Sequence, residues 1–105
     1  MKIEKVTTRI GARISGIDLT RPLDTSTVAE IRAALLDNLV LFFVEQNKLT
    51  PEQHIRLARY FGEIDIPEFK THASTHPEVM VLDQVAPKGQ GSDSWHADNT
   101  YREAP

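Results

Sequence analysis

Two side chains near the end of the sequence could bind a metal ion. In the stretch SWHADNTYREAP, one residue separates His96 from Asp98. Side chains at positions i and i+2 of an extended strand point to the same face, so the imidazole and the carboxylate would project together. These nitrogen and oxygen donors suit non-haem Fe(II), and a 2-His-1-carboxylate triad leaves positions open for a co-substrate and oxygen. We therefore take His96 and Asp98 as candidate metal ligands and catalytic residues.

The spacing alone leaves the metal site open, because it also occurs in surface ion pairs and around buried structural histidines. The sequence has no cysteine, which excludes disulfides, thiolate catalysis and cysteine-based zinc sites. A metal ion would depend on histidine, aspartate or glutamate. His72 and His76 are four residues apart, but Pro77 and the poor helix formers between them argue against a helical metal pair.

Length and composition indicate a single globular domain. The chain has 105 residues, of which 40% are hydrophobic and 26% are charged, as is typical of globular proteins. The net charge is -3 and the basic residues are scattered, so we expect no nucleic-acid partner. No apolar run is long enough for a membrane helix, and MKIEKVTTRI lacks the apolar core of a signal peptide. We expect a cytoplasmic protein that does not bind membranes.

Hydropathy patterns in the first half predict alternating strands and helices, and hence an α+β fold. Apolar residues at even positions predict a strand over 6–14, with Gly11 at a bend. A capping-box spacing predicts a helix from Thr27 to about Asn38. The apolar run 39–44 predicts a strand buried on both faces at the centre of the core. The inward face of the helix is expected to carry Val28, Ile31, Ala34 and Leu35.

A second helix is predicted after residue 50 from its end signals. These signals are Thr50 at the N-cap, Pro51 at the first helical position, Gln53 completing a capping box and Gly62 just past the end. Leu57, Ala58 and Phe61 are expected to face inward. Residues 63–75 lack periodicity and predict a loop, followed by a strand over 79–85. A glycine-containing loop then leads to an extended stretch with the His-x-Asp pair.

Three stretches together carry a family resemblance: IGARISGIDLTRPL, IRAALLDNLVLFFVEQNKLTPEQHIRLARYFGEI and SWHADNTYREAP. In this order they resemble the N-terminal part of the taurine dioxygenase family, the Fe(II)- and 2-oxoglutarate-dependent dioxygenases. The resemblance covers nearly the whole chain and is weakest between Asp65 and His76. It implies a double-stranded β-helix, which is a jelly-roll-like core. Residues 1–105 would form a single domain that is the N-terminal fragment of a longer dioxygenase domain.

The resemblance also implies the chemistry. His96 and Asp98 would supply two of three iron ligands, with Fe(II) as the metal and 2-oxoglutarate as co-substrate. The family couples oxidative decarboxylation of 2-oxoglutarate by molecular oxygen to hydroxylation of a substrate carbon, and we expect a small anionic organic substrate here. The residues expected to contact the substrate are Asn99 and Ser94, which flank the ligand pair, and His72, in a loop that approaches the substrate in the family.

One departure from the family pattern limits the expected activity. The family's second iron histidine and its 2-oxoglutarate-binding arginine lie far downstream of the His-x-Asp pair, whereas this sequence ends at Pro105. We expect a fragment that is inactive by itself. For the full-length protein, assembly into a homo-oligomer is an open alternative. One alternative is an inactive remnant or binding module of the same fold. Another is an unrelated α+β domain in which His-x-Asp is structural.

Overall fold

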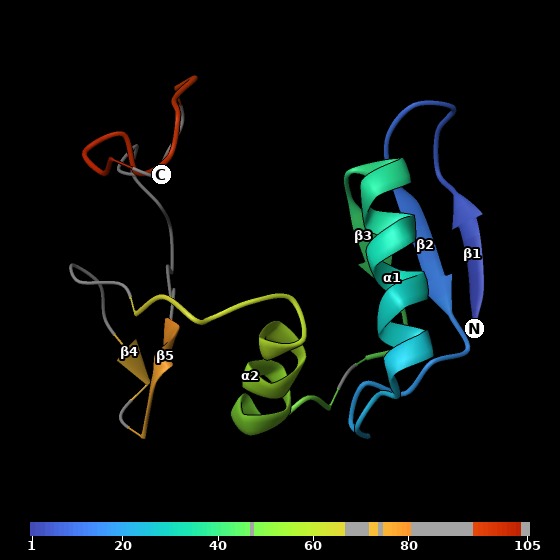
Figure 1. The fold of residues 1–105 in the computed structure, drawn as a ribbon, viewed down its shortest axis with the longest axis horizontal. Coiled ribbons are helices and arrows are strands. Elements are labelled where there is room, and N and C mark those ends of the chain that lie inside the picture. The colour runs from blue at the N-terminus through green and yellow to red at the C-terminus, as the bar shows by residue number, and fades with distance from the viewer. Residues whose placement is uncertain (47, 67–71, 74, 81–93, 104–105) are drawn as a thin grey trace, which may run out of the picture.

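The computed structural model describes residues 1–46, 48–66, 72–73, 75–80 and 94–103. Within these ranges the chain forms two helices and five strands, in the order β1, β2, α1, β3, α2, β4, β5 (Figure 1). The strands are β1 (Lys2–Lys5), β2 (Ala12–Ser15), β3 (Leu41–Phe43), β4 (His72–Ala73) and β5 (His76–Met80), and the helices are α1 (Thr25–Asn38) and α2 (Pro51–Arg59). This mixture agrees with the predicted α+β class. None of the described helices is long and apolar enough to cross a membrane.

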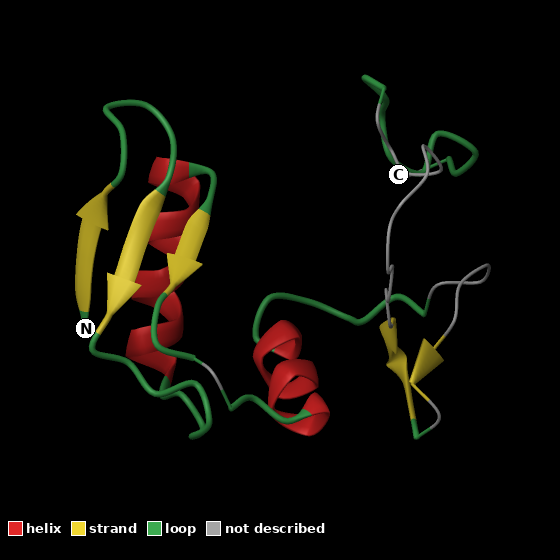
Figure 2. Ribbon diagram, turned by 180° about the vertical axis from the view of Figure 1, so that it is seen from behind, coloured by secondary structure: helices red, strands yellow, loops and turns green. Residues whose placement is uncertain are grey.

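The first three strands form a mixed sheet in the order β1-β2-β3. β1 runs antiparallel to β2, and β2 runs parallel to β3. The connection from β2 to β3 contains α1, which lies across one face of the sheet. Figure 2 shows the opposite face, with the strands in front of the helix. Within the described residues no helix covers this second face.

The core lies between β2 and α1. Ala12 and Ile14 are fully buried, and both point to the face that α1 covers, since they are two residues apart on a strand. On the helix, Ile31 and Ala34 are three residues apart and are also buried. Burying a side chain such as that of Ile31 stabilises a fold by about 1.5–3 kcal/mol. This small set of contacts fixes α1 on the sheet.

The predicted strand over 39–44 is shorter and less buried than expected. β3 covers Leu41–Phe43 and takes the outer position of the three-stranded sheet, beside β2. Phe42 is 52% exposed, because its side chain points to the face that α1 leaves uncovered. The middle strand is β2, so the prediction that 39–44 forms the centre of the core is wrong.

Only the end of the predicted strand over 6–14 forms a strand, because residues 6–11 make a turn and β2 begins at Ala12. The turn joins β1 to β2, and the Val6 N–H donates to the Gly11 carbonyl at 2.8 Å. Thr7 Oγ1 donates to the Ile10 carbonyl at 2.6 Å. Gly11 has φ +90, in the left-handed region where a side chain would be strained. The bend at Gly11 is therefore confirmed, but the strand begins after it.

α1 begins two residues earlier than predicted. Asp24, and not Thr27, is the N-cap, because its Oδ1 accepts from the Thr27 N–H at 2.7 Å. This hydrogen bond, together with one that Ser26 Oγ donates to the same carboxylate, lowers the pKa of Asp24 below its usual range. The predicted end at Asn38 is confirmed. Leu35 is exposed and does not belong to the buried face.

α2 has the predicted capping box. The Thr50 N–H donates to Gln53 Oε1 at 2.9 Å, and the Gln53 N–H donates to Thr50 Oγ1 at 3.3 Å. The helix ends at Arg59, close to the predicted end, but Ala58 is exposed and does not face inward. Arg56 Nη2 donates to the Thr20 carbonyl at 2.8 Å, which ties α2 to the segment before α1.

β4 and β5 form an antiparallel hairpin after α2. β4 lies inside the region predicted to be a loop, and β5 begins at His76, before the predicted start of the strand over 79–85. Residues 81–85 of that prediction lie outside the described ranges. β5 contacts α2, and His76 Nε2 lies 3.0 Å from Glu52 Oε1. This contact joins the hairpin to the first turn of α2.

Candidate metal centre

His96 and Asp98 lie in a segment of bends and turns, residues 94–103, that contains no strand. The prediction that an extended strand aligns them is wrong. Asn99 follows directly with φ 53, in the left-handed region, and turns the chain after Asp98. Even so, His96 Nε2 lies 3.1 Å from Asp98 Oδ1. The turn, in place of a strand, brings the two predicted ligands together.

A hydrogen bond to the backbone orients the His96 ring. His96 Nδ1 lies 2.8 Å from the carbonyl oxygen of Ser94. Because a carbonyl oxygen can only accept, Nδ1 must carry the proton and donate. In the neutral ring this leaves the lone pair on Nε2, the atom that faces Asp98. Metal-binding histidines commonly donate their second nitrogen in this way.

Both neighbours of His96 favour its charged form. The Ser94 carbonyl, and then the Asp98 carboxylate, raise the pKa of His96 above its ordinary value. The His96 side chain is 48% exposed and that of Asp98 is 85% exposed, so solvent and metal ions can reach both. A metal ion at Nε2 would have to replace the proton that the ion pair favours.

The two donor atoms fit a first-row metal as neighbouring ligands. Two ligand atoms at right angles, each about 2.1 Å from the metal, lie about 3 Å apart. The observed separation of 3.1 Å between Nε2 and Oδ1 agrees with this value. Among the described residues, no group of three or more metal-binding side chains lies close enough together to hold an ion. The part of the chain that the structure describes therefore brings together a two-donor site.

Of the three residues predicted to contact the substrate, the structure describes the side chains of two. Asn99 and Ser94 are exposed beside the ligand pair, and Asn99 Oδ1 accepts from Tyr101 Oη at 3.4 Å. His72 belongs to β4, where it pairs with Met80 of β5, and its side chain lies outside the described part. The sequence prediction assigned a role to the Ser94 side chain, whereas the structure shows its carbonyl orienting His96. Backbone groups are the same in every residue, so no sequence signal marks this role.

The other histidines do not join the pair. His54 is exposed on α2, as its place in the first helical turn indicates. His76 pairs with Glu52 through Nε2, and its Nδ1 lies 2.8 Å from Thr75 Oγ1. A helical metal pair of His72 and His76 is excluded by the structure, because both residues lie in strands of the β4–β5 hairpin.

Comparisons with known proteins show which family the chain resembles. A family model described as "Taurine catabolism dioxygenase TauD, TfdA family" matches residues 2–105. The alkylsulfatase of Acinetobacter baylyi is 37% identical over 111 residues, covering 99% of this chain and 32% of the alkylsulfatase. The alpha-ketoglutarate-dependent sulfate ester dioxygenase of Pseudomonas putida is 34% identical over 111 residues, covering 99% of this chain and 34% of that protein.

The fold of the chain is also similar to that of a solved dioxygenase structure. The crystal structure of a taurine dioxygenase from Burkholderia xenovorans matches with a TM-score of 0.66 and 46% sequence identity, over 72% of this chain and 26% of that one. Such dioxygenases have a jelly-roll fold, and the partial mixed sheet seen here is consistent with a portion of it. The chain spans about a third of the length of the curated relatives that it matches. Because the family model matches almost the whole sequence, the chain belongs to the taurine catabolism dioxygenase TauD, TfdA family.

Proposed function

We propose that this chain is part of an Fe(II)- and 2-oxoglutarate-dependent dioxygenase that hydroxylates a small anionic organic substrate. One observation carries the proposal: His96 Nε2, the ring nitrogen that Ser94 does not hold, lies 3.1 Å from Asp98 Oδ1. His96 and Asp98 would supply two of three iron ligands. The third ligand and the 2-oxoglutarate site would come from outside the described residues. Residues 1–105 would then be the N-terminal portion of one dioxygenase domain.

The residues of the chain have distinct tasks in this proposal. Bound Fe(II) would supply the redox chemistry that couples 2-oxoglutarate decarboxylation by oxygen to substrate hydroxylation. The Ser94 carbonyl holds a proton on His96 Nδ1, which keeps Nε2 directed toward the metal position. Asp98 Oδ1 provides the negative charge beside it. His96 must be neutral to bind, so it gives up a proton when the metal binds.

The class of substrate is inferred from the relatives. Two of the curated relatives are an alkylsulfatase and a sulfate ester dioxygenase, which supports a sulfate ester as the anionic substrate of the protein that contains this chain. We propose His72, Asn99 and Ser94 as substrate contacts. Ser94 and Asn99 are exposed on either side of the ligand pair, where a substrate near the metal would pass, and the imidazole of His72 could donate to a sulfate oxygen.

Metal titration tests the ligand assignment. Under anaerobic conditions, calorimetry should show that His96→Ala and Asp98→Ala each weaken Fe(II) binding roughly tenfold or more, since even the outer partners of ligands cost tenfold to a hundredfold when lost. His54→Ala is the matched control, because His54 is exposed on α2 and should bind Fe(II) as the original chain does. Equal Fe(II) affinity in all four proteins would refute the assignment.

A second function follows from the two-donor site. Because the described residues bring together no third metal-binding side chain, the alternative is a catalytically inactive remnant or binding module of the same fold. Release of carbon dioxide from 2-oxoglutarate by the full-length protein that contains this chain, measured with Fe(II), oxygen and an alkyl sulfate, separates the two. Release that depends on His96 supports the dioxygenase. Fe(II) binding without carbon dioxide release supports the binding module.

A further inference from the structure

The ligand pair lies on a segment that secondary structure does not hold. Residues 94–103 form bends and turns, and the side chains of 94–101 are exposed. A metal site on such a segment loses conformational entropy when the metal binds, because the backbone between the ligands becomes fixed. A contact that fixes the segment before the metal arrives would reduce this loss.

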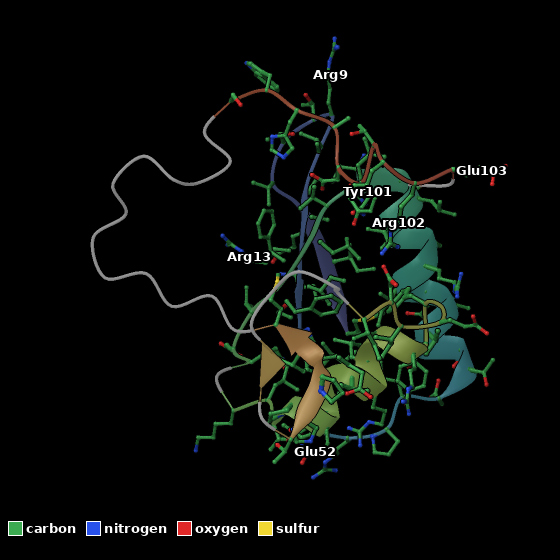
Figure 3. All side chains as sticks on the ribbon, turned by 90° about the vertical axis from the view of Figure 1, so that its left-hand side faces the viewer. Arg9, Arg13, Glu52, Tyr101, Arg102 and Glu103 are labelled. Carbon is green, nitrogen blue, oxygen red and sulfur yellow. The ribbon has the colours of Figure 1, made fainter. Side chains whose placement is uncertain are left out.

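Arg102 makes a contact of this kind. Its side chain is 28% exposed, less than its neighbours in the segment, and Nη1 donates to Asp65 Oδ2 at 2.5 Å. Asp65 is 37 residues earlier in the sequence and lies after the end of α2. The Arg102 guanidinium also lies 5.7 Å from the centre of the Tyr101 ring, and Figure 3 shows the two side chains on the same segment.

The backbone connects Arg102 to Asp98. Asn99, next to Asp98, adopts the left-handed conformation with φ 53, and the Arg102 N–H donates to the Asn99 carbonyl at 3.0 Å. This hydrogen bond closes a tight turn between the two residues. A side chain anchored at Arg102 therefore also restricts the backbone that carries the Asp98 carboxylate.

We infer that Arg102 and Asp65 form a positioning pair, which holds the turn after Asp98 against the segment following α2 and thereby pre-orders His96 and Asp98 for metal binding. The inference rests on the proposed function, since it concerns the same ligands. Neither residue touches the metal, so both act through the turn. The planar guanidinium suits this task, because it can donate to a carboxylate while its face lies near an aromatic ring.

The expected effect is modest, because both members of the pair are partly exposed. Ion pairs of this kind change equilibria by up to about fivefold. With Co(II) chloride as the probe, Arg102→Ala and Asp65→Ala should each weaken binding about three- to fivefold. The double variant should be no weaker than either single variant, because each substitution removes the same contact. Arg102→Lys should recover part of the affinity, since it keeps the charge and loses the planar geometry.

The control removes a comparable ion pair elsewhere. Arg21→Ala deletes an exposed pair in which Arg21 Nε lies 3.4 Å from Asp18 Oδ2, and it should leave Co(II) affinity unchanged. The reversed pair, Asp65→Arg with Arg102→Asp, should bind Co(II) more tightly than either alanine variant. Circular dichroism of each variant separates a loss of the contact from a loss of the fold, and the reversed pair keeps the test informative if one alanine variant unfolds.

The outcomes distinguish this inference from the proposed function. If His96→Ala abolishes Co(II) binding but the Arg102 and Asp65 variants bind like the original chain, the positioning pair is refuted and the ligand assignment stands. If the two single losses add in the double variant, the residues act independently and the inference also fails. If His96→Ala leaves Co(II) binding intact, the proposed metal site itself is wrong.

Discussion

Metal binding to the His96–Asp98 pair should depend on pH through a single proton. The Ser94 carbonyl and the Asp98 carboxylate raise the pKa of His96, so the charged ring persists to higher pH than in an ordinary histidine. Nδ1 keeps its proton in the hydrogen bond to Ser94, which leaves the proton on Nε2 as the one that a metal must replace. Below the raised pKa, Co(II) affinity should therefore fall about tenfold for each unit of pH.

The sign follows from which form of His96 the fold favours. The two contacts stabilise protonated His96, so their contribution to folding is complete at pH values below its ordinary pKa and is lost as the pH rises through the raised pKa. Metal binding changes in the opposite direction: it strengthens as the pH rises and levels off once His96 is neutral.

Calorimetry can count the protons directly. Co(II) titrations at acid pH in two buffers with different ionisation enthalpies should show release of about one proton per metal ion bound, and none well above the raised pKa. The pKa itself is read from the His96 ring resonances by nuclear magnetic resonance. His54→Ala should show the same profile, because His54 lies apart on α2. Metal affinity that does not change across the His96 titration would refute the idea that Nε2 is a ligand.

Two further predictions concern the elements that support the site. Ile31→Ala should lower the free energy of unfolding by about 2–5 kcal/mol in chemical denaturation, because Ile31 is 1% exposed; Leu36→Ala, at a position 79% exposed, should change it by less than about 0.5 kcal/mol. Thr50→Ala should cost about 1 kcal/mol by removing the α2 cap, and Thr50→Ser should restore most of it; equal stability of the two variants would contradict the capping role.

Sequence signals located the helices best where the signal is local. The α2 capping box was predicted because Thr50 and Gln53 are three residues apart and cap the helix through each other's backbone and side chain. The start of α1 was misplaced because Thr27 also has a capping-box spacing. The structure uses Asp24 instead, whose carboxylate accepts from the Thr27 N–H. Several polar residues compete at this helix start, and spacing alone does not show which one wins.

Long-range features were predicted less well. The run 39–44 is apolar enough for a strand buried on both faces, but α1 covers one face only, so Phe42 is exposed. His96 and Asp98 were expected to lie close together and they do, although a turn and not a strand brings them together. The contact between Asp65 and Arg102 joins residues 37 positions apart. Nothing in the local pattern of either residue indicates its partner.

The parallel pairing of β2 with β3 makes the sheet depend on the helix between them. β1 and β2 are joined by a short turn and can pair as soon as that turn forms, whereas β3 reaches its place only after the chain has crossed the sheet through α1. Breaking α1, for example with a proline at Ala33, would therefore remove a strand from the sheet as well as a helix from its face. The nascent chain must also be synthesised beyond Phe43 before this part of the fold can be completed.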